Sequence, residues 1–328
     1  MRLKNAKNGL LILAALLISG AAGGQDKFKP EIAGPYRVLF KPVQSGDAIN
    51  DHTVFQDAKG NWRMIGIVSR GNGLVETLLT PAFAHAVSPS LNQEMKELPV
   101  IFADYPDTRP KWAPHIIKDT GVYHLYAGPN KIRHYTSSDG VNWTFDSYVI
   151  DRPFSNLRDT MVIKIGERLW LMYATDSQNT ISVFESTDLE KWEWKGTAFK
   201  AIKPAPVYPK WIDISACESP FVIYYNGYYY LSVCLTASNQ PSSYSNTVII
   251  RSKNPYDFGV YSGAQTGVSA PRTQTAEYVT TLSAHAAEYI QDQDGNWWIT
   301  SCGWHGGKTP QGFEPGTLSI APLKWIKP

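Results

Sequence analysis

Cysteine and charge are both scarce in this sequence. Three of its 328 residues are Cys, and Asp, Glu, Lys and Arg together make up 18%. Three cysteines are too few for a scaffold built on disulfides, and without a CxxC motif they indicate no structural zinc site. A bridge between Cys217 and Cys234 fits the sequence as well as free buried thiols do, Cys302 included. The formal net charge is only +2 and no Lys/Arg cluster occurs, which argues against a nucleic-acid partner.

Long hydrophobic runs are equally scarce. One run from Gly9 to Ile18 follows three basic residues and precedes small residues up to Gly24. This order predicts a signal peptide over residues 1–23, because the run is shorter than the ~20 residues that a membrane span needs. Its cleavage would leave 28 basic and 29 acidic residues. We therefore expect a secreted or periplasmic protein with no membrane span.

Aromatic residues are abundant, and many of them fall in a unit that recurs along the chain. Each unit has a polar anchor, a short apolar run, a turn with Gly, and a second run rich in aromatic residues. The units begin at Asp51, Trp112, Arg158, Glu218 and His285. A turn with Gly between two alternating apolar runs is typical of a β-hairpin. No segment has a long apolar period of 3.6 residues, so we expect little helix.

A second repeated element follows several of these hairpins. It has a Ser, then a polar turn, then an aromatic residue. The copies are SSDGVNW over 137–143, STDLEKW over 186–192 and SKNPYDF over 252–258, and Ser88 in AVSPSLN stands where a first copy would be. Asp and Asn favour such turns because their side chains accept hydrogen bonds from the nearby backbone. The element predicts linkers between strands, each with an aromatic residue that packs between sheets.

These repeats predict an all-β fold. Five units, each with room for four short strands, favour a five-bladed β-propeller with four-stranded antiparallel blades around a central funnel. The blades would begin near residues 45, 108, 155, 214 and 280. A β-sandwich does not require the same unit five times. We therefore expect one propeller domain over residues 24–328.

The anchors of the units point to one shared site. In a propeller the innermost strand of each blade lines the funnel, so equivalent positions converge. Three anchors are acids, namely Asp51, Asp159 and Glu218. Converging carboxyl groups repel one another and cost stability unless they have a role. Glycoside hydrolysis uses such groups, one to protonate the leaving oxygen and one as a base or nucleophile.

The anchor motifs, taken in order and one per unit, resemble a known family. They are INDHT over 49–53, WAPH over 112–115, RDTM over 158–161, ESPF over 218–221 and HAAEY over 285–289. From about residue 49 to 304 the chain resembles the five-bladed propeller glycoside hydrolases of families 43 and 32. These families include arabinanases, xylosidases, levansucrases and invertases. The resemblance implies that the propeller is a catalytic domain.

The resemblance also implies roles for the three acids. Asp51 would be the general base of an inverting enzyme or the nucleophile of a retaining one. Asp159 would stabilise the transition state and tune the pKa of the acid. Glu218 would be the general acid, with its pKa raised by the two neighbouring carboxylates.

Six further residues are candidates for substrate binding, namely Asn50, His52, Trp112, His115, Arg158 and His285. Arg158 suits either sugar hydroxyls or a carboxylate, and Trp112 suits either a sugar face or packing between blades. His285 stands where family 43 enzymes often carry a His beside a bound ion. The resemblance therefore allows a structural calcium or sodium ion at His285, while the reaction itself requires no cofactor.

We expect a glycosidase that acts on plant or algal oligo- or polysaccharides, with arabinofuranosides or xylosides as the first substrates. Glu218-Ser219-Pro220 and His285 favour family 43 and an inverting mechanism, whereas Asn50-Asp51 resembles the invertase-like family. Two alternatives stay open. One is a retaining β-fructofuranosidase with Asp51 as the nucleophile. The other is a propeller that binds carbohydrate without cleaving it.

Overall fold

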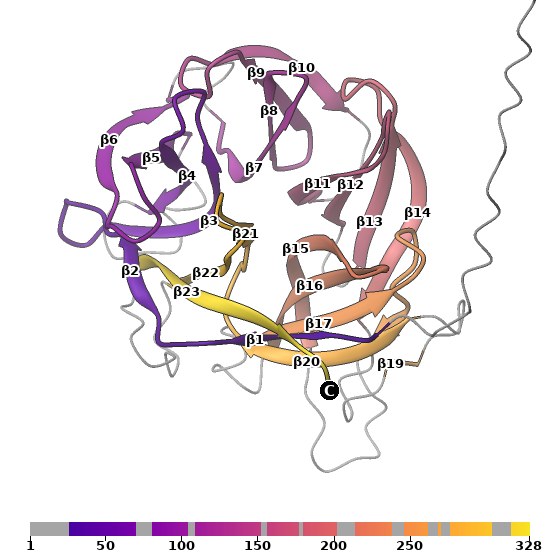
Figure 1. The fold of residues 1–328 in the computed structure, drawn as a ribbon. Coiled ribbons are helices and arrows are strands. Elements are labelled where there is room, and N and C mark those ends of the chain that lie inside the picture. Colours follow the sequence, from indigo (N-terminus) through magenta and orange to yellow (C-terminus); the bar gives the residue numbers. More distant parts are fainter. Residues whose placement is uncertain are drawn as a thin grey trace, which may run out of the picture.

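The computed structural model describes residues 26–69, 81–103, 109–151, 156–176, 180–201, 214–237, 246–261, 268–269, 276–303 and 316–328. Five sheets stand around a common axis, and the five-bladed propeller is confirmed (Figure 1). No helix within these ranges is long and apolar enough to cross a membrane. The predicted signal peptide over residues 1–23 lies outside the described residues.

The first two blades follow the chain outward from the axis. Blade 1 has β3 (Ala48–Gln56), β4 (Trp62–Ser69), β5 (Phe83–Ser88) and β6 (Lys96–Ile101). Blade 2 has β7 (Trp112–Asp119), β8 (Val122–Gly128), β9 (Ile132–Ser137) and β10 (Thr144–Ile150). All neighbouring strands in these two blades are antiparallel.

Blades 3 and 4 share this plan with one addition. Blade 3 has β11 (Arg158–Gly166), β12 (Leu169–Asp176), β13 (Thr180–Ser186) and β14 (Glu193–Ala201). Its outer edge is extended by the short strands β18 (Val260–Tyr261), parallel to β14, and β19 (Val268–Ser269). Blade 4 has β15 (Ile214–Tyr225), β16 (Tyr228–Ala237), β17 (Asn246–Ser252) and β20 (Glu277–Ser283).

Blade 5 is assembled from both ends of the propeller sequence. Its inner strands are β21 (Tyr289–Gln291), β22 (Trp297–Gly303) and β23 (Thr317–Ile326). The segments β1 (Lys29–Ile32) and β2 (Arg37–Phe40) both pair with β23, so indigo β1 runs beside yellow β23 in Figure 1. This pairing joins the last blade to the start of the chain and covers an edge that would otherwise be exposed. The repeats did not predict it, because residues 29–40 carry no copy of the repeated unit.

The linker element is confirmed by its hydrogen bonds. Ser137 Oγ donates to Asp139 Oδ1 at 2.9 Å, and Asp139 Oδ1 accepts from the backbone N–H of Val141 at 2.8 Å. Ser186 and Asp188 repeat this pattern in blade 3. The third strands of blades 1 to 4 all end on the Ser of this element, at Ser88, Ser137, Ser186 and Ser252. The aromatic residues that follow pack into the core, where Trp192 and Phe258 are buried.

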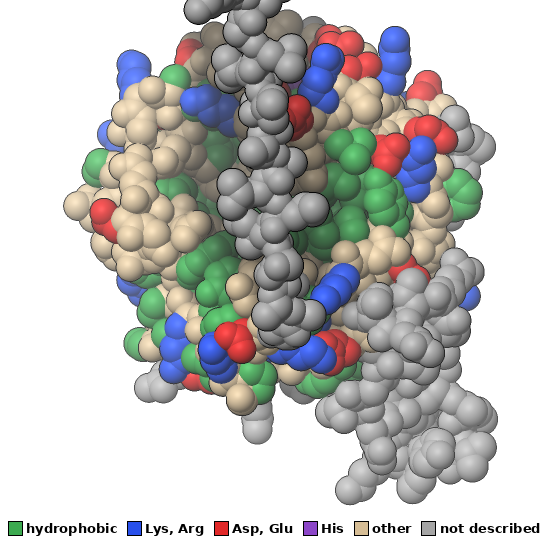
Figure 2. Space-filling view, turned by 45° about the vertical axis from the view of Figure 1, so that its right-hand side comes forward, with side chains coloured by type: hydrophobic (Ala, Val, Ile, Leu, Met, Phe, Trp, Pro, Cys, Tyr) green, Lys and Arg blue, Asp and Glu red, His purple; other side chains and the backbone are tan. Residues whose placement is uncertain are grey.

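Apolar side chains fill the wedges between neighbouring blades. Leu171 and Tyr173 of blade 3 belong to one buried cluster with Leu231 and Val233 of blade 4. On the face shown in Figure 2, hydrophobic side chains gather toward the middle and charged side chains lie around the rim. Burial of these wedges holds the blades in place, and the funnel residues are thereby positioned on a rigid frame.

Histidines inside the propeller make the folded chain sensitive to acid. Burial lowers the pKa of His52, His85 and His124 to about 4. An unfolded chain protonates His near pH 6.5, so between about pH 6.5 and 4 the unfolded state binds more protons than the folded state. The free energy of unfolding should therefore decrease as the pH falls through this window. Thermal melts followed by circular dichroism should give a lower Tm at pH 5 than at pH 7.

His85 offers a matched test of this explanation. Its Nε2 lies 2.8 Å from Nη1 of Arg63, so a protonated His85 would face a cation. Burial and the Arg63 charge both lower the pKa of His85. The variant His85→Gln should show a smaller loss of Tm between pH 7 and pH 5 than the parent chain. An unchanged loss would show that other groups cause the sensitivity.

Candidate active site

The inner strands share an irregularity that shapes the funnel. Their pairing with the next strand slips by one residue, between Trp112 and His115 in blade 2 and at the corresponding places in blades 1, 3 and 4. Just at this bulge, one residue in each of blades 2 to 5 has a positive φ between 45° and 54°, namely Ala113, Asp159, Ser219 and Ala286. Residues other than Gly rarely adopt this conformation, and it is concentrated at functional sites.

Asp51 occupies the bulge position of blade 1. All five bulge residues, Asp51, Ala113, Asp159, Ser219 and Ala286, line one cavity at the axis. The three acids were expected at one equivalent position of their blades, and the register corrects this. Asp51 and Asp159 share the bulge position, whereas Glu218 lies one residue earlier, at the position that Arg158 holds in blade 3.

Ser219 connects the two acids at the bulge positions. Its hydroxyl donates to Asp51 Oδ1 at 3.2 Å, and its backbone N–H donates to Asp159 Oδ2 at 3.1 Å. Because Ser219 directly follows Glu218, these contacts bring all three acids to one site. The sequence analysis assigned Ser219 no role. The available signal was the dipeptide Ser219-Pro220, which corresponds to Ala113-Pro114 in blade 2.

Arg158 contacts two of these acids. Arg158 Nη2 lies 3.3 Å from Glu218 Oε2, and Arg158 Nε lies 3.4 Å from Asp159 Oδ2. Thr175 Oγ1 also donates to Asp159 Oδ2, at 3.2 Å. Of the two predicted uses of Arg158, the structure therefore shows contact with carboxylates. These contacts fix the orientation of Asp159 and Glu218 within the funnel.

Burial and neighbouring negative charge raise the pKa of two of the acids, Asp51 and Glu218. Burial raises the pKa of Asp51 well above its usual range, and the charges of Asp159 and Glu218 raise it further. Burial also raises the pKa of Glu218, followed by the charge of Asp159, while Arg158 opposes both shifts. The predicted direction for Glu218 is confirmed, but burial is its largest cause, and of the two neighbouring carboxylates that were expected to contribute, Asp159 does so. The raised pKa of Asp51 was not predicted.

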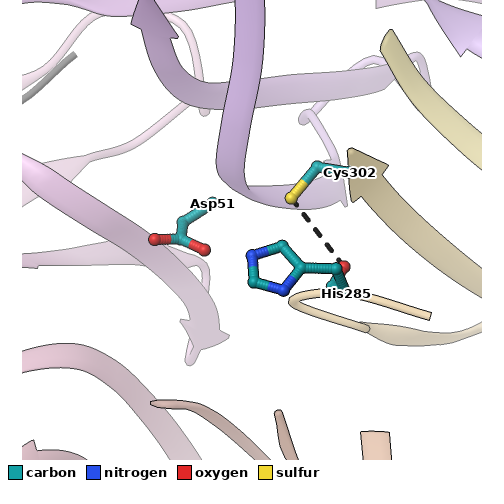
Figure 3. Close-up of side chains that lie close together, drawn as sticks. All are labelled: Asp51, His285 and Cys302. Atoms are coloured by element: carbon teal, nitrogen blue, oxygen red, sulfur yellow. Dashed lines mark hydrogen bonds between the residues drawn. The ribbon is translucent and has the colours of Figure 1, made fainter. Parts of the chain in front are cut away.

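His285 lies beside the acids, among thiols. Its Nδ1 is 2.9 Å from Cys234 Sγ, and its backbone N–H donates to Ser301 Oγ at 2.9 Å. Figure 3 shows the other ring nitrogen turned toward the carboxylate of Asp51, with Cys302 close to both residues. All three cysteines are buried and none of them forms a disulfide, so the alternative of a bridge between Cys217 and Cys234 is wrong. Asn50, a predicted substrate ligand, accepts a hydrogen bond from Cys302 Sγ at 3.3 Å.

Two predicted histidines, His52 and His115, line the cavity at the axis. His52 Nε2 contacts Thr300 Oγ1 at 2.7 Å, and His115 Nδ1 lies 3.6 Å from Glu288 Oε1. Glu288 also lines the cavity and accepts a hydrogen bond from the backbone N–H of Val54 at 2.9 Å. These contacts of Glu288 were not predicted from the sequence.

Trp112 lies outside the cavity lining. It packs against the buried cluster that includes Phe55, Ile116 and Leu125 of blades 1 and 2. Of its two predicted roles, the structure therefore shows packing between blades.

Comparison with known proteins gives results for the fold only. The sequence matches no protein-family model and no curated protein sequence. Solved structures do match. An exo-1,5-α-L-arabinanase from a bovine ruminal metagenomic library is 15% identical, with a TM-score of 0.58 over 86% of this chain and 94% of that chain. A GH43_1 enzyme from Xanthomonas citri, solved in complex with xylotriose, is 12% identical, with a TM-score of 0.58 over 86% of this chain and 88% of that chain. The chain has the fold of family 43 glycoside hydrolases.

A solved structure of another kind of enzyme has the same fold. The sucrose-6-phosphate hydrolase from Lactobacillus gasseri is 17% identical, with a TM-score of 0.59 over 90% of this chain. The match covers 61% of that longer chain. At these identities the likeness concerns the arrangement of the strands, whereas the chemistry depends on the funnel residues.

Proposed function

We propose that this protein is a glycosidase that hydrolyses arabinofuranosides or xylosides of plant or algal oligo- and polysaccharides. The observation that carries the proposal is the group of Asp51, Asp159 and Glu218 at the axis, connected by Ser219 and Arg158. A binding protein has no use for two half-buried carboxyls with raised pKa values, since they cost stability. Acid and base catalysis requires such groups.

The proposed reaction uses one proton donor and one proton acceptor. Glu218 gives its proton to the glycosidic oxygen as the bond to the anomeric carbon breaks, and the alcohol leaves. Asp51 takes a proton from a water molecule that attacks the anomeric carbon from the opposite face, which inverts its configuration. Asp159 and Arg158 stabilise the charges of the transition state. Exchange of one proton each with solvent returns Glu218 and Asp51 to their starting forms.

The proposal includes a testable role for Arg158 in the pH profile. Arg158 opposes the raised pKa values of Asp51 and Glu218. In the variant Arg158→Met both values should rise, so both limbs of the kcat/KM profile should move to higher pH, by about one unit, with a loss of about tenfold at the optimum. Arg158→Lys keeps the charge and should move the limbs less. Identical limbs in the Met variant and the parent would contradict this role.

Two solved neighbours guide the choice of substrate. One is named as an arabinanase and the other was solved with xylotriose. The test is a panel of aryl glycosides, arabinans, xylans and fructans with analysis of the products. We expect release of arabinose or xylose, or of their oligomers. Binding of these sugars in calorimetry with no product after long incubation would instead support the carbohydrate-binding alternative.

A retaining β-fructofuranosidase is the second candidate, because a neighbour is named as a sucrose-6-phosphate hydrolase. In that reaction Asp51 would attack the anomeric carbon and form a covalent intermediate. NMR of the first-formed anomer separates the two mechanisms. Inversion on an arabinofuranoside or xyloside supports our proposal, whereas retention on a fructoside supports the alternative.

We also propose that the chain is exported, with a signal peptide over residues 1–23 and one catalytic domain over residues 24–328. The support is the basic start, short apolar run and small residues before Gly24. Expression of the full chain in a bacterial host should yield a periplasmic or secreted protein whose first residue lies near position 24. An N-terminus that still carries Arg2 would contradict the export proposal.

A further inference from the structure

We infer that the funnel contains a binding site for a thiophilic divalent cation of the zinc class, formed by Asp51, His285 and Cys302, and that a cation bound there blocks hydrolysis. The blocking effect rests on the proposed function, because it depends on Asp51 acting in the reaction. The binding itself does not depend on that function.

The three residues come together from distant parts of the chain. Asp51 is on β3, His285 precedes β21, and Cys302 is on β22. One carboxylate oxygen, one ring nitrogen and the sulfur all lie within 4.8 Å of one another. Figure 3 shows the three side chains gathered at one place. A bound zinc ion would draw these atoms to about 3.5 Å apart, given its bond lengths of about 2.0–2.3 Å. Small rotations of side chains would cover this difference.

Neighbouring groups fix the orientation of the His285 ring in a way that suits cation binding. The contact of Nδ1 with Cys234 Sγ at 2.9 Å fixes one side of the ring, and Figure 3 shows the other nitrogen facing Asp51. Metal-binding histidines characteristically have a partner of this kind on the nitrogen that does not bind the metal. A second group of Glu218, Cys234 and His285 also lies within 4.8 Å, so both proposed catalytic acids flank the same imidazole.

The donor atoms favour a soft or borderline cation. Calcium requires six to eight oxygen ligands, and sodium likewise prefers oxygen. Besides His285, each of the two groups offers one thiol and one carboxylate. A carboxylate, an imidazole and a thiolate are ligands that zinc uses, with a fourth position for water or another ligand. The donor set therefore differs from the one that the family resemblance would suggest for calcium or sodium.

Binding would release protons. The Cys302 thiol must lose its proton to bind as a thiolate, and Asp51 must be ionised, so each cation displaces protons to solvent.

The test measures binding and inhibition separately on the full chain. Cd²⁺ is added in place of zinc, because a cadmium–thiolate bond gives an ultraviolet charge-transfer band that requires no enzyme activity. We expect this band in the parent protein and its loss in Cys302→Ser. Asp51→Asn keeps the thiol and should show the band only at concentrations at least tenfold higher. Cys217→Ser is the matched control, since Cys217 is also a buried free thiol but lies outside both groups.

For each variant, the rate of hydrolysis is measured with and without Zn²⁺. The ratio of the two rates gives the inhibition constant for that variant. The inhibition constant should rise at least tenfold in Cys302→Ser and stay at the parent value in Cys217→Ser, and Ca²⁺ should not inhibit. A parent protein without the cadmium band, or equal zinc inhibition in the parent and Cys302→Ser, would overturn the inference. If the protein shows the cadmium band but cleaves no glycoside, the cation site is supported and the proposed function is rejected.

Discussion

Replacement of Glu218 by Gln is expected to lower kcat on unactivated oligosaccharides by about 10²–10⁴-fold, the usual contribution of a general acid. Gln cannot donate the proton that the leaving alcohol needs. Its shape is close to that of Glu, and its side chain can still accept the contact from Arg158 Nη2 that Glu218 Oε2 now accepts. The measurement is steady-state kinetics on arabino- or xylo-oligosaccharides, with a thermal melt to verify folding.

The leaving group provides the decisive control for this variant. An aryl glycoside with a strongly acidic phenol needs little protonation, so Glu218→Gln should lose far less activity on it than on an oligosaccharide. Glu193→Gln is a matched variant on the surface, because the side chain of Glu193 is 73% exposed. It should retain full activity on both substrates. An equal loss on both substrates in Glu218→Gln would contradict the role of Glu218 as the acid.

Replacement of Asp51 by Asn is expected to reduce kcat by at least about 10³-fold on every substrate, whatever the leaving group. The attack on the anomeric carbon needs Asp51 either as the base or as the nucleophile, and Asn can serve as neither. The two variants therefore differ in their dependence on the leaving group. Rates close to the parent's in Asp51→Asn would reject the proposed site altogether.

Although Asp51→Asn should lose activity, its thermal stability at pH 7 should not decrease. Burial and the charges of Asp159 and Glu218 raise the pKa of Asp51, so its ionised form is unfavourable in the folded chain at pH 7. A group with a raised carboxyl pKa destabilises the fold increasingly as the pH rises above its unfolded value. Asn removes this cost, and the Tm of Asp51→Asn at pH 7 should equal or exceed that of the parent. Asp151→Asn, at an exposed ion pair with Lys131, should change neither property.

The sequence predicted the fold because its main signals are local. The Gly-containing hairpins and the Ser–Asp linkers join residues only a few positions apart, as the bond between Ser186 and Asp188 illustrates. The five-fold recurrence of these units then indicated the propeller. The closure by β1 and β2 carries no such signal, since Lys29 pairs with Ile326 across almost the whole chain.

The sequence predicted which acids belong to the candidate site, but it did not predict which residues contact one another there. Asp51, Asp159 and Glu218 could be identified because each stands at the anchor of a repeated unit. The role of Ser219 depends on its left-handed backbone, with a φ of 51°, and neither composition nor spacing indicates that conformation for a Ser before Pro.

By itself, then, the sequence determined the strands, their turns and the set of acids that the blades present, because alternation, turn chemistry and repetition act over short distances. Only the tertiary structure decided which groups touch. Ser219 meets Asp51 across 168 positions of sequence, and Glu218 meets Arg158 across 60. Such contacts exist only after the blades have closed into a ring, because packing between blades, and no local rule, sets the distances between their inner strands.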